Sequence, residues 1–111
     1  MRIIGIDPGL RHTGWGIVEF KNNKLIYIDD GTISPSTSIS DGKRLFFIKS
    51  QLSQIISKYS PNKSAIEQIF VGFGAGSSLK LGMARGVSMS VLAESGLDIT
   101  EIPPKLVKKT I

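Results

Sequence analysis

The chain of 111 residues contains no cysteine and a single histidine, His12. Without thiols there can be no disulfide, no cysteine nucleophile and no thiolate ligands for zinc or an iron–sulfur cluster. No arrangement of serine, histidine and aspartate indicates nucleophilic catalysis either, and we expect His12 to be a turn residue rather than a ligand. Any chemistry must therefore come from oxygen and nitrogen groups.

Long apolar runs are also missing. No stretch approaches the roughly 20 apolar residues that a membrane-spanning helix needs. The chain begins with a strand pattern directly after Met1-Arg2, not with a charged region followed by an apolar helix. We expect no membrane association, no export signal and a cytoplasmic location. The length suits one domain, residues 1–111, with a single core.

Positive charge is in excess. Fourteen Lys and Arg against nine Asp and Glu give a formal net charge of +5. This balance suits a polyanionic partner such as a nucleic acid. Small basic proteins without such a partner are common, so charge alone does not decide the function.

The first half of the chain has the pattern of a meander followed by a helix. Short apolar runs predict antiparallel strands over 2–7, 13–20 and 25–33, with a turn at Asn22-Asn23. Apolar residues then recur at steps of three and four over 45–59, which predicts a helix.

The second half alternates strands and helices. The expected elements are a strand at 63–67, a helix from Ser77 or Ser78 to about Ser95 stopped by Gly96, a strand at 97–102 and a helix that starts at Pro103-Pro104. This order predicts an α/β fold with a five-stranded mixed sheet flanked by helices.

Two of the predicted strands end on an acid, at Asp7 and Glu67. Because a helix separates the two strands, we expect a crossover that makes them parallel and brings both carboxylates to one edge of the sheet. A hard divalent cation such as Mg²⁺ would relieve their repulsion. The alternative is that Asp7 caps the turn at Gly9 while Glu67 pairs with a lysine.

Four segments resemble the RuvC family of Holliday junction resolvases: residues 4–9 (IGIDPG), 13–16 (TGWG), 65–70 (AIEQIF) and 79–87 (LKLGMARGV). The resemblance runs from residue 2 to the end of the chain, with the motifs in family order and spacing. It implies a ribonuclease H-like fold.

The resemblance also implies a homodimeric, structure-specific endonuclease that resolves four-way DNA junctions in recombination and repair. Its partners would be the branch-migration proteins RuvA and RuvB. Four acids of the family hold Mg²⁺ or Mn²⁺, with two ions per active site, and Asp7 and Glu67 match the first two acids. The other two follow the equivalent of Ile111, so the chain would be a C-terminally incomplete nuclease domain. Asp98 and Glu101 do not match, and we expect them on a strand far from the ligand end.

Contacts to DNA are implied at several further positions. Phe70 matches an aromatic residue that the family uses at the junction, whereas Phe73 matches none and is as well explained as a core residue. Lys80, Arg85 and Lys108 are candidates for a phosphate track, and Lys108 matches a basic position of the family.

The predicted second helix carries Gly82 and Gly86 on one face, which suggests close approach of another element. The resemblance places this helix in the dimer interface, and packing on the chain's own sheet is the alternative.

Other functions stay open. Actin-like and sugar-kinase proteins share the fold but need two domains, which 111 residues cannot supply. A RuvC-like nuclease of ribosomal RNA processing lacks the AIEQ and LKLG-x-ARG segments. A junction-binding module without catalysis is the third alternative.

Overall fold

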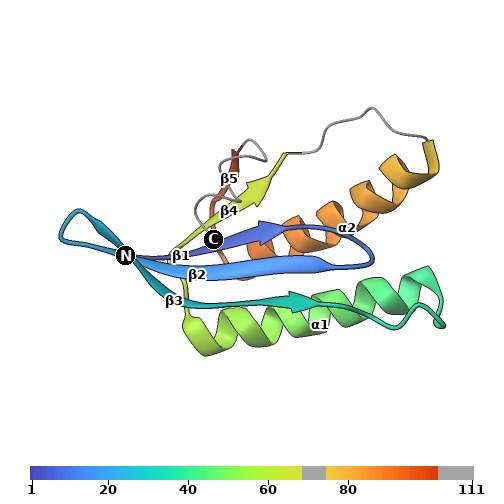
Figure 1. The fold of residues 1–111 in the computed structure, drawn as a ribbon, viewed down its shortest axis with the longest axis horizontal. Helices are drawn as coiled ribbons and strands as arrows, with labels where there is room; N and C mark the ends of the chain where they lie inside the picture. Colours follow the sequence, from blue (N-terminus) through green and yellow to red (C-terminus); the bar gives the residue numbers. More distant parts are fainter. Residues whose placement is uncertain (69–74, 103–111) are drawn as a thin grey trace.

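The computed structural model describes residues 1–68 and 75–102 (Figure 1), and side chains are described at all of these except 75–77. Seven elements follow one another: β1 (Arg2–Asp7), β2 (Thr13–Lys21), β3 (Lys24–Ile33), α1 (Asp41–Tyr59), β4 (Lys63–Glu67), α2 (Ala75–Glu94) and β5 (Ile99–Ile102). The helix predicted from Pro103 lies outside the described residues.

The strands form one five-stranded sheet in the order β3-β2-β1-β4-β5. The strands β1, β2 and β3 are an antiparallel meander, whereas β4 pairs parallel to β1 and β5 parallel to β4. The predicted mixed sheet and the predicted crossover are confirmed. The hairpin between β2 and β3 turns at Asn22 and Asn23, whose φ angles of 54° and 61° suit the twist of a two-residue hairpin.

The core lies on one face of the sheet. Side chains alternate between the faces of a strand, and the fully buried Ile4, Ile6, Ile17 and Ile66 share the face that carries both helices. Helix α1 contributes a stripe of one residue per turn, made of Arg44, Ile48, Leu52 and Ile56. No helix within the described part of the chain has the length and apolar character to cross a membrane.

Two helix boundaries differ from the sequence prediction. Helix α1 begins at Asp41 because the Ser40 side chain accepts a hydrogen bond from the Lys43 N–H and caps the helix. Helix α2 already includes residues 75–78, so the predicted cap at Ser77 or Ser78 is wrong.

The predicted stop of α2 at Gly96 is confirmed. Gly96 has φ of 79°, and its N–H donates to the Ala93 carbonyl at 3.0 Å while the Leu97 N–H donates to the Leu92 carbonyl at 3.1 Å. This hydrogen-bond pair is the Schellman motif, which favours glycine because glycine adopts positive φ without steric cost.

Candidate functional site

The two acids at the strand ends lie in neighbouring positions. In the parallel pairing of β1 and β4, Ile6 is the partner of Ile66, and the next residue along each strand is Asp7 or Glu67. Neighbouring strands lie about 4.8 Å apart. The prediction that both acids reach the same edge of the sheet is therefore confirmed.

Both carboxylates belong to the face of the sheet opposite the two helices. They alternate with Ile6 and Ile66, which are fully buried on the helix side. Glu67 is only 9% exposed, and Asp7 is partly exposed. Beside Asp7, β2 carries Gly14, and a Cβ built there would lie 3.7 Å from the Asp7 Cβ. The glycine thus keeps the space next to the Asp7 carboxylate open.

The turn that follows Asp7 is closed by Thr13. The Thr13 hydroxyl donates to the Gly9 carbonyl at 2.7 Å and accepts from the Gly9 N–H at 3.3 Å. The Asp7 carboxylate forms no hydrogen bond or ion pair with any of the described residues. The alternative that Asp7 caps this turn is therefore wrong, because Thr13 already fills that role.

The other two acids considered as ligands do not join this pair. Asp98 lies just before β5 and not on it, and its carbonyl accepts the Ser64 hydroxyl near the opposite end of β4. Its predicted distance from the ligand end is confirmed. Glu101 was expected far from the ligand end, but it is the partner of Ile66 in the register and so lies near that end. It shares the helix side of the sheet with Ile66, however, and forms an ion pair with Arg85 of α2.

Asp7 and Glu67 fit a divalent cation by the chemistry of their donors. Carboxylate oxygens are the ligands that Mg²⁺ prefers. Residues 1–68 and 75–102 contain no cluster of three or more candidate ligand side chains. Two carboxylates can hold one ion whose shell is completed by water, whereas two adjacent ions need further anionic ligands to offset their repulsion.

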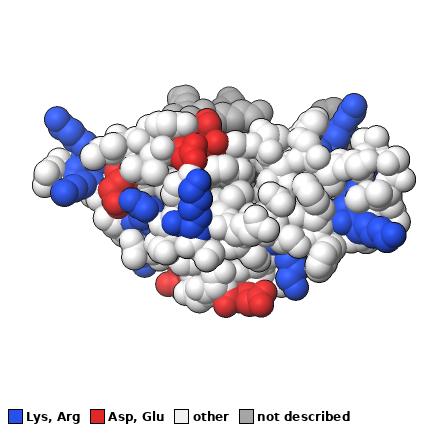
Figure 2. All heavy atoms as spheres, turned by 90° about the horizontal axis from the view of Figure 1, so that it is seen from below, with Lys and Arg blue, Asp and Glu red and all other residues white. Residues whose placement is uncertain are grey.

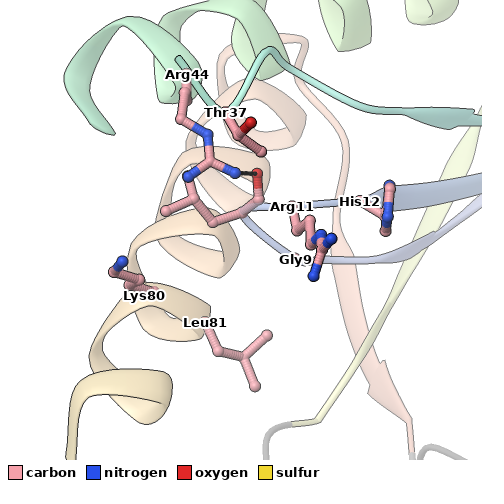
Figure 3. Close-up of a pocket in the computed structure, with 8 residues that line it drawn as sticks. Gly9, Arg11, His12, Thr37, Arg44, Lys80 and Leu81 are labelled. Carbon is pink, nitrogen blue, oxygen red and sulfur yellow. Dashed lines mark hydrogen bonds between the residues drawn. The ribbon is translucent and has the colours of Figure 1, made fainter. Parts of the chain in front are cut away.

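A cavity of about 620 Å³ opens at the same end of the molecule. Its walls come from the turn after Asp7, the loop before α1, the first turn of α1 and the second turn of α2 (Figure 3). Three of the lining side chains are cationic: Arg11, Arg44 and Lys80. Lys80 is exposed, as the predicted phosphate track requires.

Sequence reasoning had missed Arg11 and Arg44. A usable signal was present for Arg44, which extends the buried stripe of α1 in steps of four residues ahead of Ile48. A charged residue that continues an apolar stripe is buried among partners more often than its type suggests.

The remaining predicted DNA contacts divide into two groups. The Arg85 side chain is only 18% exposed and is neutralised by Glu101, so it stabilises the packing of α2 on β5 and does not face a solvent-exposed track. Phe70, Phe73 and Lys108 lie outside the described residues.

Helix α2 presents a continuous stripe of small residues to solvent. Gly82 and Gly86 are exposed, and a Cβ built at either would have no atom within 4 Å. Leu79, a large apolar residue one turn before Gly82 on the same face, is 66% exposed. The alternative that these glycines pack on the chain's own sheet is therefore wrong for the described residues.

Comparison with known proteins gives a consistent family. The sequence profile described as Crossover junction endodeoxyribonuclease RuvC matches residues 3–111. Proteins of that name from Rhodopseudomonas palustris (strain BisA53) and Afipia carboxidovorans are each 45% identical over the whole chain. The chain spans only 64% and 65% of their lengths.

Among solved structures, Thermus thermophilus RuvC in complex with a Holliday junction substrate superposes with a TM-score of 0.88. That superposition covers 98% of this chain and 67% of the other, at 25% identity. The expected ribonuclease H-like fold is confirmed.

Proposed function

The chain belongs to the RuvC family, and from this premise we propose that it is the larger part of a nuclease domain that resolves Holliday junctions by metal-dependent phosphodiester hydrolysis. The observation that carries the proposal is the register of β1 and β4, which brings Asp7 and Glu67 to adjacent strand ends. A fold match alone would not suffice, because one fold hosts many functions.

In this proposal Asp7 and Glu67 hold the cation through their carboxylate oxygens, Mg²⁺ by preference and Mn²⁺ as a substitute. A bound divalent cation supplies an activated water and stabilises the leaving oxygen. The open position at Gly14 leaves room for a DNA strand beside Asp7. The two further acids of the family, needed for a second ion, would follow residue 111.

We further propose that the protein acts in the cytoplasm as a homodimer on four-way junctions, together with RuvA and RuvB. The exposed stripe on α2 supports the dimer, because Gly82 and Gly86 allow a second helix to approach closely. Phe70 and Lys108 are proposed junction contacts from the family resemblance, and Phe73 is a weaker one.

The test uses Asp7→Asn and Glu67→Gln in the full gene product, with Asp98→Asn as the matched control. Each test substitution removes one ligand charge without touching the basic surface. Loss of an outer-shell partner of a metal costs roughly 10- to 100-fold, so loss of a ligand should reduce junction cutting by more. Junction binding should change little, and Asp98→Asn should cut normally. Cutting at the wild-type rate by either test variant would refute the metal site.

A catalytically incomplete junction-binding module is the second candidate, favoured by the resemblance, which matches only Asp7 and Glu67 to the four acids of the family. The 111-residue chain and the full gene product should be compared in Mg²⁺ or Mn²⁺. We expect the short chain to bind Mg²⁺ weakly and to leave junctions uncut. Equal cutting by both would show that the four-acid site does not apply to this protein.

A further inference from the structure

Three cations, Arg11, Arg44 and Lys80, line the cavity, and the Asp41 carboxylate beside Arg44 offsets part of their charge. None of the described residues that line it carries a carboxylate. Both helices begin at this end of the molecule, where the β1–β2 turn also lies (Figure 1), and the cavity adjoins the first turn of α1, the positive end of that helix dipole. In Figure 2 the same right-hand end shows Lys and Arg side chains without an acidic side chain among them.

Arg44 is the fixed part of this site. It is only 9% exposed, its Nη2 donates to the Leu10 carbonyl at 3.1 Å, and its Nη1 lies 3.6 Å from the Asp41 carboxylate. Its Nε is buried and has no hydrogen-bond partner among the described residues. Burial of a charged group is costly unless it is fully paired. Because Arg44 lines the cavity, an anion there would offset the part of its charge that the Leu10 carbonyl and Asp41 leave uncompensated.

The exposed cations complement Arg44. Arg11 lies on the turn and Lys80 on α2, both exposed at the cavity rim, and Thr37 adds a hydroxyl from the loop before α1 (Figure 3). A guanidinium that is held in place, two exposed cations and a hydroxyl are donors that suit a phosphate group.

We infer that this cavity binds a phosphate group of the DNA backbone, and the inference rests on the proposed nuclease function. Arg44 and Lys80 come from the helices, which cover the face opposite Asp7 and Glu67. The bound phosphate would therefore lie on the helix side of the sheet. The turn of residues 8–12 would separate it from the two carboxylates. The cavity would thus hold the strand in position without taking part in the chemistry.

The experiment measures binding without cutting, in the absence of divalent cations. Amide NMR shifts of the 111-residue chain are followed on addition of inorganic phosphate and, separately, of a short DNA duplex. Lys80→Ala and Arg11→Ala are the test variants, and Lys24→Ala is the control because Lys24 is an exposed lysine in the hairpin at the other end of the sheet. Arg44→Lys keeps the charge but removes the planar fork.

We expect both probes to shift the amides of Gly9, Leu10 and Leu81. The double variant Arg11→Ala/Lys80→Ala should make the slope of log K for the duplex against log salt shallower by up to about 0.9, the value for one lost phosphate contact, and each single variant should account for part of that change. Arg44→Lys should weaken the binding of both inorganic phosphate and duplex. The control Lys24→Ala should bind both as tightly as wild type. Shifts with inorganic phosphate but not with duplex would assign the cavity to a free phosphate compound and overturn the DNA assignment. Unchanged slopes in both test variants would overturn it as well.

This result is separate from the fate of the nuclease proposal. If duplex binding depends on the cavity but Asp7→Asn still cuts junctions, the phosphate site stands and the metal site falls. If Asp7→Asn abolishes cutting while the cavity variants bind DNA like wild type, the metal site stands and the phosphate site falls.

Discussion

The side chain of Thr13 offers a sharp test of how the turn after Asp7 is held. Thr13 is fully buried, and its hydroxyl bonds both the N–H and the carbonyl of Gly9. The substitution Thr13→Val keeps the shape and the β-branching but removes both hydrogen bonds. The turn would then have two backbone groups without their partner.

The magnitude follows from these two contacts. A hydrogen bond contributes about 0.5–1.5 kcal/mol net, and a buried group left unsatisfied costs about 1–3 kcal/mol. Gly9 is half-buried, so water reaches its groups in part. We expect a loss of about 2 kcal/mol in the free energy of unfolding, which is a substantial part of the 5–15 kcal/mol typical of a domain.

Urea denaturation of the purified chain measures this loss. With a slope of about 2 kcal/mol per molar urea, the midpoint should fall by about 1 M. Thr32→Val is the matched control, because Thr32 is exposed on β3 and a surface substitution changes stability by no more than about 0.5 kcal/mol. If the two variants unfold at the same urea concentration, the reasoning about the turn is refuted.

Two further predictions concern other contacts. Gly31→Ala should lower the free energy of unfolding by about 1–3 kcal/mol, measured by thermal denaturation, since a Cβ there would lie 2.8 Å from the Trp15 ring. The control is Gly42→Ala, which should be neutral or stabilising because a Cβ there would have no atom within 4 Å. The Tyr59 hydroxyl donates to Asp29 and lowers the pKa of that carboxyl from its usual 3.8. This contact should stabilise the fold at pH values above the usual pKa of 3.8. The stabilisation should be lost as the pH falls through the lowered pKa of Asp29. The stability difference between wild type and Tyr59→Phe should therefore shrink in acid, and a constant difference would contradict the assignment.

The sequence was sufficient to predict the order of strands and helices and the parallel pairing of β1 with β4. Those predictions depend on periodicity and on the rule that a helix between strands makes a crossover, both of which are local signals. The position of Glu101 was predicted wrongly, because the same crossover rule makes β5 parallel to β4 and brings the end of β5 to the edge of Asp7 and Glu67; only the face that Glu101 occupies depends on the register. A shift of one residue would move every side chain of the strand to the other face.

The charges show a second limit of sequence reasoning. Arg85 was predicted to contact phosphate, but in the folded chain it is paired with Glu101 from a different element. Arg44 attracted no attention because a lysine or arginine on a helix is usually a surface residue. Which cation is paired and which lines a cavity depends on long-range contacts that no local pattern contains.

The pairing of β1 with β4 also bears on the order in which the chain acquires its parts during synthesis. The meander of β1, β2 and β3 is local and can form as soon as residues 1–33 have left the ribosome, whereas the partner of Asp7 arrives only with β4, after α1. Contacts between residues far apart in the sequence form late, because closing the loop between them costs entropy before the contacts contribute any stabilisation. A nascent or misfolded chain would therefore lack the assembled carboxylate pair. On the proposed function, such a chain would not cleave DNA until its sheet is complete.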